Sequence, residues 1–491
     1  MGRKSDYSND MYKQLQEIMG RLDSVEKDLK TEKHEHKKDV DRLNDKINSL
    51  EKTIEEKDRE IEVLTNDNER LKRIINNDSS NSSLPPSTDQ RGKKANTYNG
   101  REKSEKKAGA QKGHKGVTLT KQDAEEKLRS GRFEHKIENI GTSEGKYITK
   151  YVMDLEVIPV IREIRIYADS DGRFHVPEEY RSDVTYGSKI KTMAVDLYSE
   201  GVMSNERICA FLNTISGNTL ELSAGSVYGF CKSFSEKCVP SLNQIEEELL
   251  NEKNVCTDAT VVTVNGKQAY IRNTSSEKAV LYHAMENKSI EALDAIEFLT
   301  KYAGTLTHDH ETALYHYGTK HGECNVHLLR YLKKNTEEAL NHWSSELAAY
   351  LCKMNDDRKE RIKKGITFTE EELAAYEKRY DEIIAEGKIQ NKHTKGRLAK
   401  QEEKTLLTRL EKYKKNHLLF LYDFSVPFEN NMSERDLRKC KNRQKMSGGF
   451  RKQSGNEMYC AIMSIIETCK RKKMQVIENI KRIFDGTPAI F

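Results

Sequence analysis

Apolar residues recur at alternating spacings of four and three residues near the start of the chain. The step from Leu29 to Val40 equals a heptad plus four residues, which predicts a local unwinding of a supercoil. A seam this long predicts a coiled coil over residues 1–78, which would join the chain into a homodimer or a higher oligomer. The alternative is a single solvated amphipathic helix, which can show the same spacing. The apolar seam positions are Met11, Leu15, Ile18, Leu22, Val25, Leu29, Val40, Leu43, Ile47, Leu50, Ile54, Ile61, Leu64, Leu71 and Ile75.

A polar stretch without apolar periodicity follows at residues 79–120. Pro85-Pro86 interrupts it, and nine Lys or Arg residues fall between Arg91 and Lys115. Such a composition cannot form a core, so we predict a flexible basic linker. The linker either gains order on nucleic acid or remains a solvated tether.

Two small modules are predicted next. Residues 147–167 are β-branched and partly alternating, with a turn signal at Asp171-Gly172, so residues 121–185 are expected to form a small β-rich module. Residues 186–250 carry helical spacings instead. Three short helices joined by Gly and Ser turns are typical of a helix-turn-helix, with Ser223 opening its recognition helix, whereas a plain helical packing module is the alternative.

Strand patterns return at residue 255. Two alternating runs, 255–264 and 268–273, flank Asn265-Gly266, a strong hairpin signal. A third strand, a helix and a fourth strand are expected at 279–285, 289–302 and 304–308. Three strands in a meander, then a helix, then a strand is the opening of a ribonuclease H-like fold.

Long charged helices interrupt this domain at about 330–422. Thr369 to Glu372 predicts a capping box, and Gly387 is expected to end the helix that it starts. The predicted fold class is therefore multidomain α/β: a coiled coil, a helix-turn-helix module, and a ribonuclease H-like catalytic domain at 251–452 with a helical insertion. A helical tail at 453–491 completes the chain.

Composition and charge limit the function classes. Charged residues are 33% of the 491 residues and hydrophobic residues only 35%, which fits solvated helices better than one packed globule. No apolar run is long enough to span a membrane, and no signal segment is present, so we expect no membrane partner. The nine Cys residues form no C-x-x-C pair, which indicates a reduced compartment. A net charge of +5 requires that any nucleic acid be bound by local patches.

Three acids stand where the predicted fold would bring them together. Asp258 lies in the first strand, Asp309 ends the fourth, and Glu434 lies early in the helix after the insertion. Phosphoryl transfer uses two divalent ions, and Mg²⁺ or Mn²⁺ prefers carboxylate oxygens as ligands. Each acid also has a structural interpretation. In particular, Glu434 would complete a capping box if Asn431 were the N-cap.

Several stretches resemble the insertion-sequence sixty-six (IS-sixty-six) family of bacterial transposases. They include His308 to Tyr315, Cys324 to His327 and, above all, PFENNMSERDLRKCKNRQKMSGGFR at 427–451. The coiled coil, NSSLPPSTD at 81–89 and GAQKGHKG at 109–116 follow the same family order. The resemblance covers nearly the whole chain.

The resemblance implies a DDE transposase whose triad and metal ligands are Asp258, Asp309 and Glu434. It implies Mg²⁺-dependent hydrolysis that frees 3′ hydroxyls at the ends of an insertion sequence, followed by their attack on target DNA. Its expected partners are the terminal inverted repeats, target DNA and accessory element-encoded proteins, in the cytoplasm and associated with the nucleoid. The chain has Asp258-Ala259-Thr260 where the family commonly has Asp-Glu-Thr. Residues 115–180 lack the Cys residues of the zinc motif that many members carry, so we predict no zinc.

Other motifs are less specific. Cys324-x-x-His327 matches a family signature of unclear role, and a buried Cys beside a helix-facing His is the alternative. A basic run beside the third acid is predicted to contact DNA, or to form a solvated helix face. Its members are Arg435, Arg438, Lys439, Lys441, Arg443, Lys445, Arg451 and Lys452.

Two other functions remain open. One is a non-catalytic DNA-binding protein derived from a transposase. The other is a hydrolase that binds a metal through His308 and His310. A barrel hydrolase of that kind requires a repeating strand and helix pattern, which the charged helices of 330–422 do not supply. In a strand, the two His side chains would also share the face opposite Asp309.

Overall fold

A computed structural model of the chain describes residues 4–76, 120–131, 133–140, 146, 148–153, 155–339 and 341–491. The predicted linker at 79–120 lies outside the described residues except for its last position. The chain forms two compact units, one built from residues 1–94, 331–349 and 378–412 and the other from the remaining residues. None of the described helices is long and apolar enough to cross a membrane.

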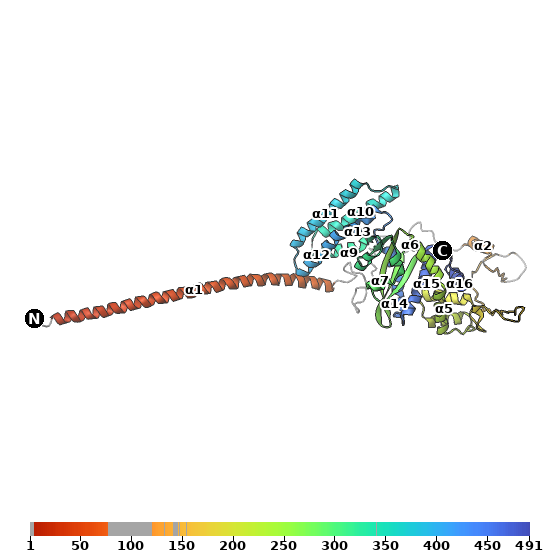
Figure 1. The fold of residues 1–491 in the computed structure, drawn as a ribbon, viewed down its shortest axis with the longest axis horizontal. Helices are drawn as coiled ribbons and strands as arrows, with labels where there is room; N and C mark the ends of the chain where they lie inside the picture. Colours follow the sequence, from red (N-terminus) through yellow and green to blue (C-terminus); the bar gives the residue numbers. More distant parts are fainter. Residues whose placement is uncertain are drawn as a thin grey trace. The chain divides into compact units, whose positions relative to one another are not determined.

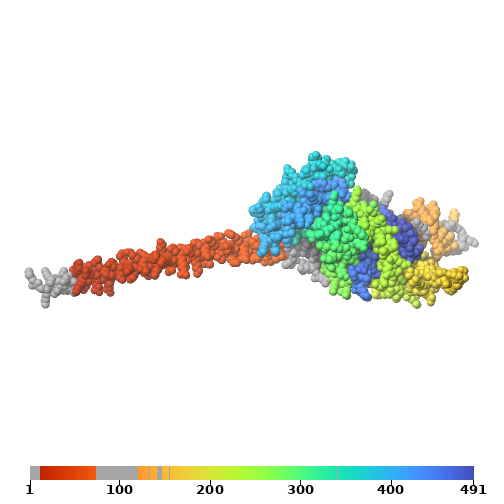
Figure 2. Space-filling model, in the orientation of Figure 1, coloured from red at the N-terminus to blue at the C-terminus, as the bar shows by residue number. Residues whose placement is uncertain are grey.

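The first unit contains α1 (Lys4–Asn76), a single long helix that fits the predicted coiled coil (Figure 1). Figure 2 shows its side chains in the open along most of the helix. Seam residues are accordingly exposed, with Leu22 at 62% and Leu50 at 53%. Apolar side chains repeated at this spacing gain stability only when a partner covers them.

The last turns of α1 pack on the helical part of the same unit. Arg70 is 4% exposed and donates hydrogen bonds to Glu338 and Glu402, at 2.8 and 2.6 Å from Nη2. Asp67 Oδ1 accepts a hydrogen bond from Leu398 N, 3.0 Å away, at the start of α12. Asp67 and Arg70 are buried, whereas Leu64 and Leu71 on the seam are exposed. The face of α1 that packs on its own unit is therefore not the face that carries the apolar seam.

Five helices between the last strand of the sheet and α14 form the predicted insertion. They are α9 (Asn325–Ala339), α10 (Trp343–Lys364), α11 (Glu370–Lys392), α12 (Arg397–Lys412) and α13 (Lys414–Tyr422). The capping box is confirmed, because Thr369 N–H donates to Glu372 Oε2 and Glu372 N–H donates to Thr369 Oγ1.

The prediction that Gly387 ends this helix is wrong. The helix continues to Lys392, and Gly387 lies where a Cβ would come within 2.8 Å of both Trp343 and Leu407. This glycine permits close helix packing instead of a stop.

A buried carboxylate lies beside that contact. Glu403 is fully buried and accepts hydrogen bonds from Trp343 Nε1, Asn391 Nδ2, Thr394 Oγ1 and Asn341 Nδ2 at 2.5 to 2.7 Å. Burial alone would raise the pKa of its carboxyl, but these hydrogen bonds hold that pKa below its usual value.

The second unit is built on a five-stranded mixed sheet in the order β3-β2-β1-β4-β5. The strands are β1 (Asn254–Val264), β2 (Lys267–Ser275), β3 (Val280–Met285), β4 (Thr305–His308) and β5 (Lys320–Glu323). The first three are antiparallel neighbours, whereas β4 runs parallel to β1 and β5 parallel to β4. The turn at Asn265 and Gly266 has φ of 50° and 74°, the left-handed pair that a two-residue hairpin needs.

Short helices connect these strands. The single helix predicted at 289–302 is divided into α7 (Ile290–Asp294) and α8 (Glu297–Lys301), because Ile296 adopts an extended ψ of 94°. A 3₁₀ helix, η3 (Thr312–His316), links β4 to β5. The four strands predicted between residues 255 and 308 are confirmed.

Helices from two other parts of the chain pack with this sheet. The residues predicted as a helix-turn-helix form α3 (Ser188–Ser199), α4 (Asn205–Ile215), α5 (Ala224–Lys237) and α6 (Val239–Leu250). As predicted, α5 begins directly after Ser223, whose Oγ caps it by accepting a hydrogen bond from Ser226 N. The C-terminal helices are α14 (Asn431–Ser447), α15 (Gln453–Arg471) and α16 (Val476–Phe484).

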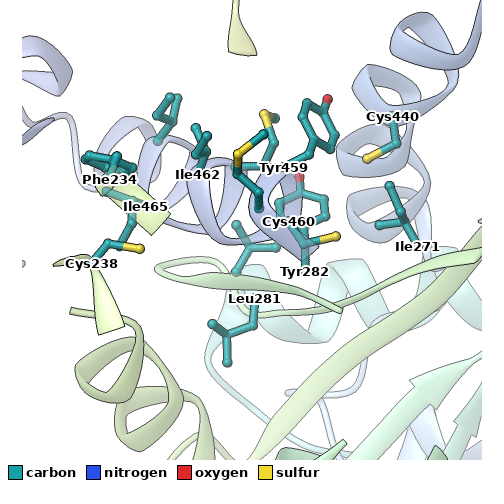
Figure 3. Packing of buried hydrophobic residues seen from close by; sticks show 14 of the residues in the cluster. Phe234, Cys238, Ile271, Leu281, Tyr282, Cys440, Tyr459, Cys460, Ile462 and Ile465 are labelled. Carbon is teal, nitrogen blue, oxygen red and sulfur yellow. The ribbon is translucent and has the colours of Figure 1, made fainter. Parts of the chain in front are cut away.

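One hydrophobic core runs through these helices and the sheet. Helix α15 packs on β3 and α14 on β1 (Figure 1). Figure 3 shows Phe234 and Cys238 near Ile462 and Ile465 of α15, with Leu281 and Tyr282 of β3 on the same cluster. The core therefore continues across the predicted boundaries at residues 250 and 452.

The β-rich module predicted at 121–185 is not seen. In the described residues of that stretch, the structure has α2 (Lys121–Arg129) and a 3₁₀ helix, η2 (Glu178–Tyr180), but no strand. The alternating apolar side chains remain exposed, and Ile161 is 99% exposed. Alternation stabilises a strand only where one face is buried, and here neither face is.

Candidate active site

Asp258 lies on β1, and Asp309 directly follows β4, the parallel neighbour of β1. Cys256 of β1 pairs with Thr307 of β4, and each acid lies two residues beyond its member of that pair. Burial, followed by the charge of Asp309, raises the pKa of Asp258 to about 6. The sheet therefore brings together two of the three predicted acids.

Backbone and side-chain bonds hold Asp258 in place. Its N–H donates to Asn273 Oδ1 at 3.1 Å, and its own Oδ1 accepts from Ala259 N at 2.7 Å. The Oδ2 atom of Asp436 in turn accepts from Asn273 Nδ2 at 3.1 Å and from Arg471 Nη2 at 2.6 Å. This network, which connects β1, β2, α14 and α15, was not predicted, because no local pattern links residues so far apart.

Glu434 comes to the same place from α14. The helix begins at Asn431 with Asn430 as N-cap, so Glu434 is the fourth helical residue and its N–H donates to Asn430 O at 3.2 Å. The capping-box interpretation is therefore wrong, since it required Asn431 as the N-cap. Among the described residues, no donor forms a hydrogen bond to Glu434 Oε1, which solvent does not reach.

His327 links the second and third acids. Its Nδ1 is 2.9 Å from Asp309 Oδ1, and its Nε2 is 3.7 Å from Glu434 Oε1. Burial alone would lower the pKa of His327, but the hydrogen bonds to Asp309 and Cys324 raise it to about 10. Arg330 Nη1 lies 3.0 Å from Nε2 of the same ring. Nδ1 also lies 3.4 Å from Cys324 Sγ.

Two groups of side chains at this site offer atoms of the kinds that bind metal ions: a Cys and His group, and a group of carboxylates. Asp309, Cys324 and His327 bring ligand atoms within 4.8 Å of one another, and thiol with imidazole is a donor set that suits zinc. The carboxylates of Asp258, Asp309 and Glu434 instead fit Mg²⁺ or Mn²⁺, because Glu434 Oε1 is a buried acceptor without a hydrogen-bond donor among the described residues.

The two His residues beside Asp309 have separate partners. His308 is buried and its Nε2 is 3.2 Å from His321 Nδ1, while His310 Nδ1 is 3.1 Å from Glu323 Oε1. Their rings therefore contact different neighbours, which does not support the hydrolase that would use both as ligands to one metal.

The basic run divides into buried and exposed members. Arg443 is 7% exposed, its guanidinium carbon is 4.0 Å from the ring centroid of Tyr198, and Nη1 donates to Tyr198 O at 2.8 Å. Lys439 pairs with Glu467 at 2.5 Å and with Glu200 at 3.1 Å. Internal partners thus engage both cations, although the side chain of Lys439 is 35% exposed, and contact of either residue with DNA stays a prediction. The exposed members are Arg435, Arg438, Lys441, Lys445, Arg451 and Lys452.

The family described as "Transposase IS66 family" matches residues 186–458. That segment contains the whole sheet, the three acids, Cys324, His327 and the basic run. Because the match covers more than half of the chain, the chain belongs to this family of transposases, and the resemblance drawn from its motifs is confirmed. No curated protein matches the chain.

Proposed function

We propose that the chain catalyses cleavage at the ends of an insertion sequence and joins the freed ends to target DNA. The catalytic residues are Asp258, Asp309 and Glu434. The observation that carries this proposal is the parallel register of β1 and β4, which aligns two carboxylates, together with His327, which lies between the second acid and Glu434. The family match supports the transposase function itself.

The sheet supports the same proposal. Three antiparallel strands are followed by short helices and by a fourth strand that returns parallel beside the first. This is the order expected of a ribonuclease H-like domain, and the helices α9 to α13 are its insertion. We assign the second unit to this fold, with Asp258 on the central strand β1 and Asp309 directly after the neighbouring strand β4.

The three carboxylates would hold two Mg²⁺ or Mn²⁺ ions, which supply activation of the attacking oxygen and stabilisation of the leaving oxygen. Asp258 and Asp309 approach closely enough for like-charge repulsion, which explains part of the raised pKa of Asp258. Positive charge between them relieves that repulsion, so the apo site favours binding of a divalent cation. His327 keeps Asp309 oriented by donating from Nδ1.

The exposed basic residues form the proposed DNA surface. Arg435, Arg438, Lys441 and Lys445 recur at spacings of three and four, which places them along one side of α14, the helix that carries Glu434. A row of cations beside the acids would neutralise the backbone phosphates of the strand to be cut. Helix α5, with Tyr228 and Lys232 exposed, is proposed as the recognition helix of the helix-turn-helix.

Helix α1 is proposed to pair with α1 of a second copy. Its exposed seam is apolar, whereas Asp67 and Arg70 bind the helices of their own unit through another face. Both contacts can therefore form at once. Two or more joined protomers would bring two element ends together.

Metal-dependent thermal stabilisation tests the assignment without DNA. A cation at concentration c that binds only the folded protein stabilises it by RT ln(1 + c/Kd), so its melting temperature rises with affinity and with the logarithm of concentration. Mg²⁺ and Mn²⁺ should stabilise the wild-type protein, and Glu434→Gln, Asp258→Asn and Asp309→Asn should each lose most of that effect. Glu429→Gln, an exposed acid five residues before Glu434, is the matched control and should retain it. Equal stabilisation of all variants would refute the metal site.

A further inference from the structure

Cys324 and Asn430 are buried polar residues that immediately precede α9 and α14. Cys324 is 1% exposed and Asn430 is 0% exposed. Asn430 N–H donates a hydrogen bond to Cys324 Sγ at 3.2 Å, although the two residues are 106 positions apart in the chain. This bond joins the starts of the two helices that carry His327 and Glu434.

The same two residues bond to the backbone beside each of the three acids. Cys324 N–H donates to the carbonyl of His308, the residue before Asp309, at 3.0 Å. Asn430 Nδ2 donates to the carbonyl of Thr257, the residue before Asp258, at 2.9 Å. The carbonyl of Asn430 accepts from Glu434 N at 3.2 Å.

Two further hydrogen bonds connect the start of α9 to α13 and to the segment before α14. Asn325 N–H donates to Phe428 O at 3.0 Å, opposite in direction to the bond from Asn430 to Cys324. Asn325 Nδ2 donates to His417 O at 3.0 Å. The segment before α14 is thus bonded twice to the start of α9, so the protein itself determines where Glu434 lies relative to β4.

We propose that Cys324 and Asn430 are positioning residues that set the separation of the three carboxylates before a metal ion binds. The proposal rests on the proposed function, since it concerns the spacing of the same acids. It also assigns a separate role to each residue of the Cys324-x-x-His327 motif. The thiol positions the start of α14, and the imidazole on the same turn orients Asp309.

A merely structural role would give a different result from a positioning role. If these bonds only stabilise the fold, breaking them lowers stability without changing the choice of metal. If they set the spacing of the carboxylates, breaking them weakens Mg²⁺ binding more than Mn²⁺ binding, because Mg²⁺ demands near-ideal octahedral geometry at short distances. Metal preference is therefore the informative readout.

The first variant is Asn430→Asp in the full-length protein. The side chain keeps its size, but a carboxylate oxygen replaces the Nδ2 donor that faces Thr257 O, so repulsion replaces the hydrogen bond. The matched control is Asn442→Asp, the same change at an exposed position of the same helix. Titration calorimetry without DNA would measure the affinities for Mg²⁺ and Mn²⁺.

We expect Asn430→Asp to bind Mg²⁺ on the order of tenfold more weakly than the control, with a smaller loss for Mn²⁺. Cleavage of DNA that carries the element ends should fall in Mg²⁺ and recover partly in Mn²⁺. Affinities and metal preference equal to those of Asn442→Asp would overturn the proposal.

A second set of variants tests the proposal even if Asn430→Asp does not fold. Cys324→Ser keeps an acceptor for Asn430 N–H, whereas Cys324→Ala removes it, and Cys352→Ser is the control at an exposed thiol. We expect Mg²⁺ affinity to be nearly normal for the two Ser variants and weakened for Cys324→Ala. Equal affinity in Cys324→Ser and Cys324→Ala would count against the proposal.

The outcomes separate this inference from the proposed function. If the wild-type protein binds no divalent cation and Glu434→Gln changes nothing, the proposed function fails. If the triad variants lose metal and cleavage while the Cys324 and Asn430 variants behave as their controls, only the positioning role fails.

Discussion

Arg443 and Lys445 lie two residues apart on the basic helix, but the structure gives them different roles. Arg443 is buried against Tyr198, whereas Lys445 is exposed. We therefore predict that Arg443→Met lowers stability and leaves DNA binding unchanged, and that Lys445→Met does the reverse. Methionine keeps the apolar length of both side chains, so each substitution removes mainly charge and hydrogen bonding.

The loss of stability can be worked out from the contacts of Arg443. Its Nη1 donates to Tyr198 O at 2.8 Å, and a hydrogen bond from a charged donor contributes about 1.5 to 3 kcal/mol. Its guanidinium lies 4.0 Å from the centroid of the Tyr198 ring, a cation–π contact that contributes roughly 0.5 to 2 kcal/mol when desolvated. Because such contributions are not fully additive, we expect a loss of about 2 to 4 kcal/mol.

Two assays on the same proteins test this prediction. Urea unfolding followed by the near-ultraviolet circular dichroism of tyrosine would give the stability difference. DNA affinity measured over a series of salt concentrations would give the slope of log K against log salt, which should shrink by about 0.9 for each phosphate that the variant no longer neutralises. Wild-type stability of Arg443→Met together with a reduced slope would refute the reasoning.

Three further predictions concern the first unit. A fragment of residues 1–78 should be helical and dimeric, and sedimentation that shows a monomer at about tens of micromolar would contradict the coiled coil. Arg70→Met should cost about 1.5 to 3 kcal/mol, because it removes the hydrogen bonds of a buried guanidinium to Glu338 and Glu402, whereas exposed Lys72→Met should cost little. Urea unfolding followed by the fluorescence of Trp343, the only Trp, measures both. The pKa of Glu403 is depressed, so its ionised form stabilises the fold above about pH 4.3, and this contribution is lost as pH falls through the folded pKa. The stability advantage of wild type over Glu403→Gln should therefore shrink from pH 7 to pH 4, and an advantage constant over that range would contradict the assignment.

The parts of the fold that local patterns specify were predictable. Alternation and the Asn265-Gly266 turn specify the β1–β2 hairpin, because both left-handed residues are ones that tolerate that conformation. Once the strands were placed, Asp258 and Asp309 followed, since neighbouring parallel strands convert strand position into proximity. Helix α5 was located by the capping preference of Ser223.

Other predictions failed because a pattern permits a structure without requiring it. The alternation at 147–167 finds no partner in the described residues, so its side chains stay exposed. Gly387 does not end its helix because Trp343 and Leu407 need the space that a side chain would fill. The basic run gives no indication that Arg443 is buried against Tyr198, which lies 245 residues away in the chain.

Asn430 was missed for a related reason. Its bonds reach Cys324 and Thr257, which are 106 and 173 residues away, and a single asparagine before a helix gives no indication of such partners. Only the folded arrangement shows that it bonds to the segments of Asp258 and Glu434 and, through Cys324, is linked to that of Asp309. Long-range contacts of this kind can be seen in a structure but cannot be predicted from the spacing of residues in the sequence.

Strand cleavage by Glu434→Gln tests the central claim most directly. The substrate is duplex DNA that carries the terminal inverted repeats, incubated with Mg²⁺ and full-length protein, beside the exposed control Glu429→Gln and thermal melts of both variants. We predict that Glu434→Gln folds and binds this DNA like the wild type but does not cleave it, while Glu429→Gln cleaves it normally. Wild-type cleavage by Glu434→Gln would remove Glu434 from the active site and contradict the account.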